Sequence, residues 1–410
     1  MNRLQRYNAY KESGIEWLGE IPEHWETKKV KHLFNIGRGR VISLEELKDG
    51  GLYPVYSSQT QNDGILGYIE TYDFDCEQLT WTTDGANAGT VFLREGKHNC
   101  TNVCGTLQPI EKEIILEYLK YTLQNNTIFY KRPDTNGAKI MNNEMADILL
   151  TYPLLTEQKQ IANFLDAKTQ KIDTAIKQKK ELITLLKEQK QAIINNAVTK
   201  GLDKNVTLKE SGIEWLGEIP EHWEVRKLKY LALSVSEKIE SNNSDFQYIG
   251  MENIESFSGK IITNNLEVEG LSNMFNQGDV LFGKLRPYLA KVYLCEEQGI
   301  CSTEFLVYRA INILNSFLKF VMLSNNFITL VNASTYGTKM PRANADFVNN
   351  QQIPLPPLEE QKQIANFIEK KTAYIDNAIT LQQEYIEKLK EYKTSLIDSV
   401  VTGKVRVCDE

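Results

Sequence analysis

The sequence predicts an α+β fold in which two mixed α/β domains are joined by two long antiparallel coiled-coil helices. Two sequence segments recur at a spacing of about half the chain, which indicates a tandem repeat of one unit. Within each unit, short β-like runs come first and helical segments follow, as in α+β proteins. Each unit then ends in a long ladder of apolar residues with a 3.5-residue period, which is typical of a coiled coil.

The tandem repeat is exact at two places in each unit. Lys11–Glu26, KESGIEWLGEIPEHWE, returns unchanged as Lys209–Glu224, and EQKQIANF at Glu157–Phe164 returns as Glu360–Phe367. A chain of 410 residues is long enough for at least two domains. We therefore predict a first domain at residues 1–155, a central spacer helix at 156–204, a second domain at 205–357, and a C-terminal spacer helix and tail at 358–410.

The repeated segments 11–26 and 209–224, here called the leaders, carry a dense stripe of apolar and aromatic side chains. In the first leader these are Ile15, Trp17, Leu18, Ile21, Pro22 and Trp25. The stripe favours an arm that packs on the following domain, and docking of another protein is the alternative. His24 and His222 lie within the leaders, so packing is expected of them rather than acid–base chemistry.

Between leader and long helix, each unit shows β-like runs that are separated by turn residues such as Asn62-Asp63-Gly64. The first unit has such runs at 53–58, 64–72, 78–83 and 89–93, and the second at 246–251, 260–265, 279–285, 290–295 and 304–310. A short apolar helical segment is expected after them, at 114–123 in the first unit and at 314–323 in the second.

The long helices are predicted from their apolar ladders. Alternate steps of four and three residues, from Ile161 to Ile193 and from Ile364 to Leu396, meet mostly apolar side chains without Gly or Pro. Gly201 and Gly403 mark the ends of these helices. Each helix is expected to span about 35–40 residues, or about 50–60 Å. If a pseudo-twofold axis relates the units, the helices must run antiparallel, and their outer faces remain available to another protein.

Composition limits the class of protein. Hydrophobic residues at 41% and charged residues at 25% are typical of a globular protein. No apolar run could span a membrane and no apolar signal core opens the chain, so we expect a cytoplasmic protein. Six cysteines are too few for a disulfide framework. The Cys100-x3-Cys104 pair beside His98 lacks the usual zinc spacing, and no metal site is predicted.

Catalytic motifs are missing from the sequence. There is no GxxxxGK[ST] phosphate loop, no [ND]PP[YF] tetrapeptide, and Gly37-Arg38-Gly39 lacks the third glycine of a dinucleotide-binding loop. Pro133-Asp134 followed by Glu157-Gln158-Lys159 matches a nuclease pattern, but the repeat copy at Glu360 has no such Pro-Asp upstream. The sequence therefore predicts no catalytic residue.

Basic, polar and aromatic clusters in the non-repeated stretches are the candidate binding residues. Lys and Arg bind phosphates, whereas Arg, Asn, Gln, Ser and Thr read base edges, so these clusters are compatible with DNA binding. In the first domain the candidates are Ser57, Ser58, Gln59, Thr60, Trp81, Thr82, Thr83, Asn87, Lys131, Arg132 and Lys139. In the second domain they are Lys284, Arg286, Tyr288, Lys291, Lys339 and Arg342. The alternative for each cluster is an ordinary solvated loop.

The repeated segments resemble a known family. The IPEHWE leaders, the run GTKMPR at Gly337–Arg342, the run PLPPLEEQKQIANFI at Pro354–Ile368 and its mid-chain copy are closely similar to the specificity (S) subunit of type I restriction–modification systems. The resemblance implies that each half holds a target recognition domain, which reads one part of a bipartite, asymmetric DNA target. It also implies that the spacer helices set the distance between the domains and dock the methyltransferase subunits.

The same resemblance implies that the chain has no catalytic activity or cofactor of its own. The expected partners are double-stranded DNA, two modification subunits with S-adenosylmethionine, and two restriction subunits with ATP and magnesium. These partners could supply phosphate contacts that a chain of net charge −7 lacks. One departure limits the transfer of contacts between halves, because KMPR at 339–342 appears in the first unit only as Gly137 to Asn142, GAKIMN, without Pro-Arg.

Two alternatives remain at this stage. The first is a self-sufficient DNA nuclease or methyltransferase with an unrecognised active site, and it predicts cleavage or methylation by the chain alone. The second is a coiled-coil scaffold, which predicts no salt-dependent affinity for duplex DNA.

Overall fold

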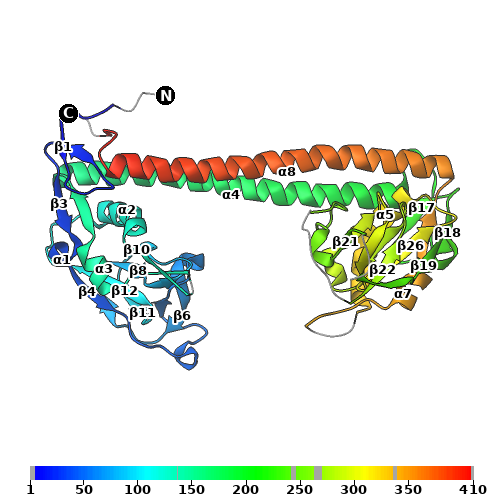
Figure 1. Ribbon diagram of the computed structural model, residues 1–410, viewed down its shortest axis with the longest axis horizontal. Coiled ribbons are helices and arrows are strands. Elements are labelled where there is room, and N and C mark those ends of the chain that lie inside the picture. Colours follow the sequence, from blue (N-terminus) through cyan, green and yellow to red (C-terminus); the bar gives the residue numbers. More distant parts are fainter. Residues whose placement is uncertain (1–4, 136, 242–245, 263–269, 336–338, 408–410) are drawn as a thin grey trace. The chain divides into compact units, whose positions relative to one another are not determined.

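The computed structural model describes residues 5–135, 137–241, 246–262, 270–335 and 339–407. Two compact units emerge, one made of Met1–Gln178 with Tyr385–Glu410 and the other of Lys179–Glu384. Two long helices, α4 (Leu155–Lys200) and α8 (Leu358–Val401), contribute a segment to each unit. Figure 1 shows the mixed sheets and helices of each globular domain beside these helices, which confirms the predicted α+β class.

Two four-stranded sheets form the domain of unit 1, in the orders β10-β8-β12-β4 and β6-β5-β11-β7. Their strands are β4 (Phe34–Arg38), β5 (Tyr53–Tyr56), β6 (Ile65–Ile69), β7 (Phe74–Asp75), β8 (Gln78–Thr82), β10 (Val91–Arg94), β11 (Lys97–Cys100) and β12 (Cys104–Pro109). Smaller sheets pair β1 (Tyr10–Glu12) with β2 (Glu20–Pro22), β3 (Glu26–Lys29) with β15 (Leu149–Tyr152), and β14 (Gly137–Lys139) with both β13 (Arg132–Asp134) and β9 (Asp84–Gly85). The shorter helices are α1 (Val30–Leu33), α2 (Leu116–Asn126) and α3 (Asn142–Asp147), with 3-10 turns η1 (Leu44–Glu46), η2 (Gln61–Gly64) and η3 (Thr127–Phe129).

Unit 2 repeats this plan with the sheets β19-β26-β23-β24 and β20-β22-β25-β21. Their strands are β19 (Ala232–Val235), β20 (Lys238–Glu240), β21 (Tyr248–Ile249), β22 (Leu271–Phe275), β23 (Val280–Gly283), β24 (Val292–Leu294), β25 (Gly299–Ser302) and β26 (Phe305–Ala310). Smaller sheets pair β16 (Leu208–Glu210) with β17 (Glu218–Pro220) and β18 (Glu224–Lys227) with β27 (Gln352–Leu355). Helices are α5 (Asn315–Leu323), α6 (Asn325–Ala333) and α7 (Ala345–Asn350), with 3-10 turns η4 (Leu228–Tyr230), η6 (Met251–Asn253) and η7 (Pro287–Leu289).

Most predicted β-like runs contain a strand, but the run at 260–265 does not among its described residues. Ile261 makes only an isolated bridge with Ile254, and residues 263–265 lie outside the described part of the chain. The neighbouring turn at Phe257, with φ of +59°, leaves the extended conformation that a strand requires. The two β-branched isoleucines of the run, Ile261 and Ile262, therefore misled the prediction.

The leaders pack on their domains, as predicted. Trp25 and Trp223 are 0% and 1% exposed. His24 Nε2 lies 2.9 Å from Glu157 Oε2, and His222 Nε2 lies 2.7 Å from Glu360 Oε1. Because these glutamates open the repeated EQKQIANF segments, the two repeated sequences contact each other within each unit.

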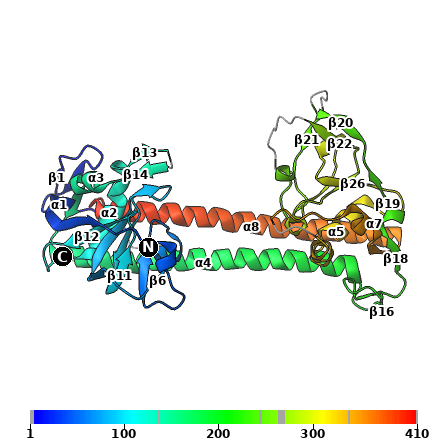
Figure 2. The same ribbon diagram turned by 90° about the horizontal axis from the view of Figure 1, so that it is seen from below.

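The long helices have 46 and 44 residues, so the prediction of 35–40 was too short. Their end turns pack on the domains rather than along the apolar ladder, as the buried Gln158 and Val198 of α4 show. In unit 1, Lys393 Nζ lies 2.7 Å from Asp173 Oδ2, and in unit 2, Lys190 Nζ lies 2.7 Å from Asp376 Oδ1. Figure 2 shows both helices as continuous elements.

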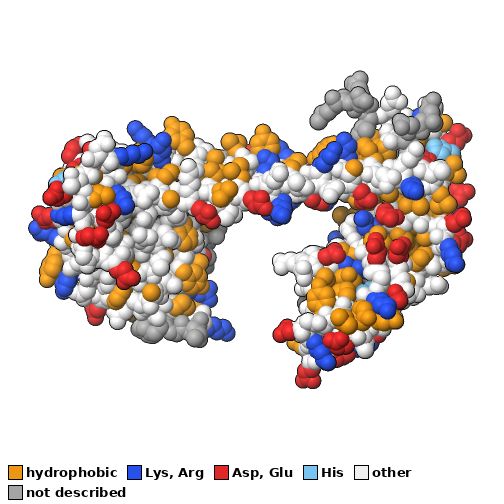
Figure 3. Space-filling model, turned by 180° about the vertical axis from the view of Figure 1, so that it is seen from behind, with side chains coloured by type: hydrophobic (Ala, Val, Ile, Leu, Met, Phe, Trp, Pro, Cys, Tyr) orange, Lys and Arg blue, Asp and Glu red, His pale blue; other side chains and the backbone are white. Residues whose placement is uncertain are grey.

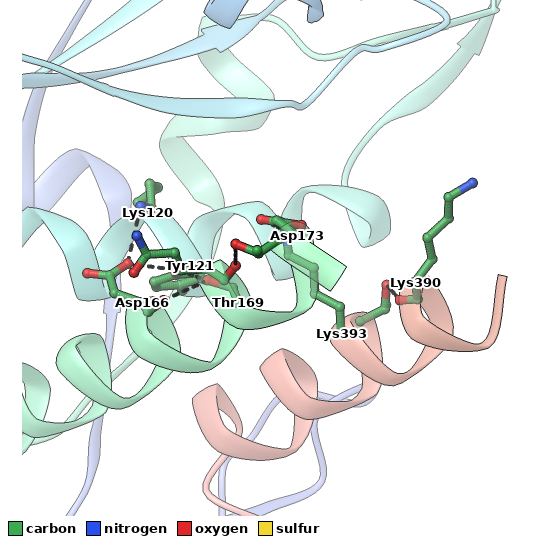
Figure 4. Close-up of polar contacts among 10 residues, drawn as sticks. Lys120, Tyr121, Asp166, Thr169, Asp173, Lys390 and Lys393 are labelled. Atoms are coloured by element: carbon green, nitrogen blue, oxygen red, sulfur yellow. Dashed lines mark hydrogen bonds and ion pairs between the residues drawn. The ribbon is translucent and has the colours of Figure 1, made fainter. Parts of the chain in front are cut away.

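Polar contacts attach α2 to α4 in unit 1 (Figure 4). The Tyr121 hydroxyl donates to Asp166 Oδ1 at 2.6 Å and lies 3.0 Å from Thr169 Oγ1. Burial, reinforced by the hydrogen bond to Asp166, raises the pKa of Tyr121. In unit 2 the matching segment FLKF at 317–320 replaces YLKY at 118–121, and Phe320 is buried in the apolar core. The same helix–helix contact is thus polar in one unit and apolar in the other.

Gly403 and Gly201 end the long helices in left-handed backbone, with φ of +75° and +72°. A Cβ at Gly403 would lie 2.3 Å from Pro22 Cδ, whereas one at Gly201 would lie 3.1 Å from Trp223 Cζ2. We expect Gly201→Ala to cost about 1–2 kcal/mol of unfolding free energy from backbone strain, and Gly403→Ala to cost more. Urea unfolding of both variants checks this, and equal losses would contradict the role of the Pro22 contact.

Candidate nucleic-acid interface

Strand pairing places a basic residue at the same position in both domains. Lys139 pairs with Asp84 beyond the end of β8, and Arg342 pairs with Leu285 beyond the end of β23. The next residue repeats the match, since Ile140 N donates to the Thr83 carbonyl and Ala343 N to the Lys284 carbonyl, each at 2.8 Å. Alignment by sequence alone, GAK at 137–139 with GTK at 337–339, would instead match Lys139 with Lys339.

Arg342 and Arg286 are held close together in unit 2. The Arg342 guanidinium donates from Nη2 and Nε to Glu304 at 3.0 and 3.1 Å, and 46% of its side chain is exposed. Arg286 has a φ of +50°, which is strained for a residue with a side chain, and its N–H donates to the Pro341 carbonyl at 2.7 Å. Lys284 and Arg286 flank Leu285, which forms the bridge with Arg342, so Lys284 also lies near both arginines along the backbone.

The remaining candidates of the second domain differ in exposure. Tyr288 is 45% exposed and lies in η7. Lys291 Nζ donates to the Ile254 carbonyl, and burial lowers the pKa of Lys291. Lys339 is exposed, but Gly337 and Thr338 of the GTKMPR run lie outside the described residues. The structure therefore brings together Lys284, Arg286 and Arg342, with Tyr288 and Lys339 at neighbouring positions.

In the first domain, the equivalent surface surrounds Lys139. Lys139 Nζ lies 3.4 Å from Asp134 Oδ2, and Arg132 Nε lies 3.3 Å from Glu144 Oε1. Lys131 and Asn87 are exposed. Exposed Arg38 also reaches this region, because its Nε donates to Asn142 Oδ1 at 3.3 Å. Arg38 was missed because it was considered only as part of a glycine motif.

Trp81, Thr82 and Thr83 support this surface from beneath. All three are buried, and the Trp81 indole N–H donates to the Ile140 carbonyl at 3.1 Å. Thr83 Oγ1 donates to the Val103 carbonyl at 3.1 Å. These contacts fix the strand end that carries Lys139, so their geometry suits positioning of the surface rather than direct contact with a ligand.

Ser57, Ser58, Gln59 and Thr60 lie in a separate loop between β5 and β6. Ser57 N donates to the Gly64 carbonyl at 2.9 Å, and Gln59 Nε2 donates to the Ile65 carbonyl. Ser57, Ser58 and Gln59 are partly exposed and Thr60 is exposed. Beneath the loop lies Arg94, whose side chain is only 1% exposed. No pattern in the sequence distinguished Arg94 from a surface arginine.

The long helices carry exposed apolar and aromatic side chains between charged ones. They are Leu182, Leu185, Tyr374, Leu381, Tyr385 and Tyr392, each at least 42% exposed. Figure 3 shows hydrophobic side chains recurring along the helices on the face it presents. Apolar surface of this kind commonly marks a protein interface.

No described helix is long and apolar enough to cross a membrane. No group of three or more His, Cys, Asp or Glu side chains that could hold a metal ion occurs within the described ranges.

Sequence comparison identifies two copies of one domain. The type I restriction modification DNA specificity domain matches residues 22–185 and again residues 220–391. The specificity subunit of the type I restriction enzyme MjaVIII from Methanocaldococcus jannaschii is 28% identical over 97% of both chains. The specificity subunit of the type I restriction enzyme MpnII from Mycoplasma pneumoniae is 40% identical over 144 residues, which are 35% of this chain and 43% of that protein.

Solved structures share the fold. A chain described under the complex assembly and conformational transition of the type I R-M system aligns with a TM-score of 0.67 at 13% identity, covering 93% of this chain and 98% of that one. The HsdS subunit from Thermoanaerobacter tengcongensis aligns with a TM-score of 0.50 at 13% identity, covering 94% and 98%.

Proposed function

Because the chain belongs to the type I restriction modification DNA specificity family, we propose that each of its two domains reads one half of a bipartite, asymmetric DNA target. The observation that carries this proposal is the equivalent placement of Lys139 and Arg342, each of which pairs with a residue just beyond the end of a central strand. A basic side chain at the same position of two otherwise different domains suits contact with two half-sites of one duplex.

Arg342 is the best placed of the candidates to read a base. Glu304 accepts from Nε and Nη2 and so orients the planar guanidinium, whose Nη atoms are the group that would match the O6 and N7 acceptors of guanine. Lys139 presents a point charge, which is better suited to a phosphate or a single acceptor. The two halves of the target are therefore expected to differ, as the different loop sequences also suggest.

The long helices are proposed to set the spacing of the half-targets and to dock the methyltransferase subunits. Asp173 and Lys190 are seventeen residues apart in α4, and Asp376 and Lys393 are seventeen residues apart in α8. This equal spacing of the two ion pairs supports one continuous antiparallel register. The exposed apolar side chains of the helices support docking of a partner protein.

The chemistry is assigned to the partners. We expect two modification subunits to use S-adenosylmethionine for methylation of adenine and two restriction subunits to use ATP and magnesium. They would also supply phosphate contacts that compensate for the net charge of −7.

Methylation by the assembled complex tests the proposal. Lys139→Ala and Arg342→Ala should each lower the methylation efficiency of the cognate site about tenfold or more, since a lost base or phosphate contact in a specific site costs about 1–3 kcal/mol. Arg342→Ala should relax the specificity of one half-target only, whereas loss of a phosphate contact in Lys139→Ala should lower methylation without changing the preferred sequence. Lys204→Ala, an exposed lysine outside both surfaces, serves as the control and should leave methylation unchanged.

Other outcomes would favour the alternatives. Loss of subunit assembly in the Lys139 or Arg342 variant would make that residue structural. Methylation or cleavage by the purified chain alone would indicate a self-sufficient enzyme. No salt-dependent DNA affinity, even with the modification subunits present, would indicate a scaffold.

A further inference from the structure

We infer that Arg94 is a positioning residue that fixes the loop 57–64 for reading the half-target of the first domain. The inference rests on the proposed function, and it concerns a residue that makes no contact with DNA itself. Its side chain is 1% exposed, whereas the loop that it supports lies at the surface. The loop carries Ser57, Gln59 and Thr60, whose side chains are suited to base edges.

Arg94 contacts two aromatic rings and a threonine hydroxyl. Its guanidinium carbon lies 3.6 Å from the centre of the Tyr56 ring and 4.3 Å from that of Phe92. Nε donates to Thr80 Oγ1 at 3.2 Å, which orients the plane of the group. A cation close to the faces of aromatic rings is stabilised by their π electrons, which offsets part of the cost of burying this arginine.

The Nη1 group of the guanidinium binds the loop through hydrogen bonds to Asp63. Nη1 donates to the Asp63 carbonyl at 2.8 Å and to Asp63 Oδ2 at 3.1 Å. Asn62 and Asp63 have φ of +49° and +51°, which side-chain-bearing residues rarely adopt in succession. A Cβ on Gly64, with φ of +77°, would lie 2.9 Å from Arg94 Nη2. The left-handed turn is therefore shaped around the guanidinium.

The same turn sets the conformation of the polar residues before it. Ser57 N donates to the Gly64 carbonyl, and Gln59 Nε2 donates to the Ile65 carbonyl. Displacement of Asp63 and Gly64 would thus release Ser57 to Thr60 as well. Preorganised contact groups raise discrimination because less ordering is required on binding.

The support of the loop by a buried arginine is specific to the first domain. Leu93 pairs with Leu79 in unit 1 as Leu294 pairs with Val280 in unit 2, so Cys295 occupies the position of Arg94. A thiol cannot bridge to a loop as a guanidinium does. The effect of removing Arg94 should accordingly be confined to one half of the target.

The experiment maps the DNA sequences that the complex with modification subunits methylates, for the wild-type chain and for Arg94→Lys. Lysine keeps the charge but loses the planar fork. We expect about tenfold weaker discrimination at one or more positions of one half-target, the size expected for one mismatch, with the other half unchanged. Gly64→Ala should disturb the same positions, because the added Cβ strains the left-handed turn and presses on Arg94 Nη2.

Arg309→Lys is the matched control in unit 2. Arg309 lies in β26 of unit 2 and donates to both carboxylate oxygens of buried Asp279, at 3.0 and 2.9 Å. Its replacement should leave the half-target affected by Arg94→Lys unchanged. Thermal unfolding of each variant complex is measured in parallel to identify general loss of structure.

The outcomes separate this inference from the proposed function. If the wild-type complex shows no sequence preference, the proposed function fails. If the wild-type complex is specific and Arg94→Lys retains its full specificity in both halves, only the role of Arg94 is overturned. The same holds if Arg94→Lys lowers stability and affects both halves equally, since a merely structural role predicts that result.

Discussion

Asp376→Asn is expected to lower the unfolding free energy of unit 2 by about 2–3 kcal/mol, because it leaves a buried ammonium group without its counter-charge. Asp376 accepts from Lys190 at 2.7 Å and lies 2.7 Å from Lys260 Nζ. The Lys190 side chain is 8% exposed, so water compensates only in part for the lost carboxylate. Lys260 is 57% exposed and contributes little to the loss. Urea unfolding, with hydrogen exchange to locate the weakened segment, measures the effect.

Asp173→Asn is the matched control, because Asp173 and Lys393 form the counterpart ion pair in unit 1. Their side chains are 55% and 31% exposed, so solvent screens the pair. We expect a loss of less than about 1 kcal/mol, as for other surface ion pairs. Equal losses in the two variants would show that burial does not govern the strength of these contacts.

The contribution of Asp376 also depends on pH in a defined direction. Burial raises the pKa of Asp376, but hydrogen bonds from Lys190 and Lys260 outweigh it and hold the pKa below the ordinary value of 3.8. A lowered folded-state pKa gives stability that is present above 3.8 and is lost as the pH falls through the folded value. The stabilities of wild-type and Asp376→Asn protein should therefore converge below pH 3.8.

The sequence sufficed for the parts of the molecule that repeat. The identical leaders and the apolar ladders predicted packed arms and two long helices, because periodicity and exact recurrence do not depend on the surrounding fold. The same ladders predicted helices that are shorter than the observed 46 and 44 residues. The end turns, such as that of Gln158, pack on the domains, and their side chains follow no seam.

The candidate site was harder to predict, because it depends on which strands pair. Only the pairing of Lys139 with Asp84 and of Arg342 with Leu285 reveals that these residues are equivalent. Trp81 is a candidate binding residue by its sequence neighbours, but β8 is a central strand and all five of its residues are buried. Arg94 could not be predicted either, because nothing in the sequence indicates that this charged side chain is buried in contact with two aromatic rings.

Removal of four equivalent residues from both long helices is expected to abolish methylation of the original target and to create a target with a shorter spacer. Deleting 181–184 and 384–387 removes one turn from each helix and keeps the two ion pairs at matching spacing, now thirteen residues in each helix. Four helical residues span about 6 Å and turn by about 40° beyond a full turn. One to two base pairs, at about 3.4 Å each, make up that distance. Both half-target sequences should remain as in the wild type.

A panel of duplexes that share both half-targets and differ only in spacer length measures this result with the assembled methyltransferase. Deletion of 181–184 alone is the control. In this variant Asp376 and Lys393 remain seventeen positions apart in the sequence, whereas Asp173 and Lys190 become thirteen positions apart. Both ion pairs cannot then form in one register, so this variant should lose stability or assembly instead of selecting a new spacer. Unchanged spacer preference in the double deletion would refute the proposal that the helices set the spacing. A changed half-target sequence would instead assign base recognition to the helices rather than to the domains.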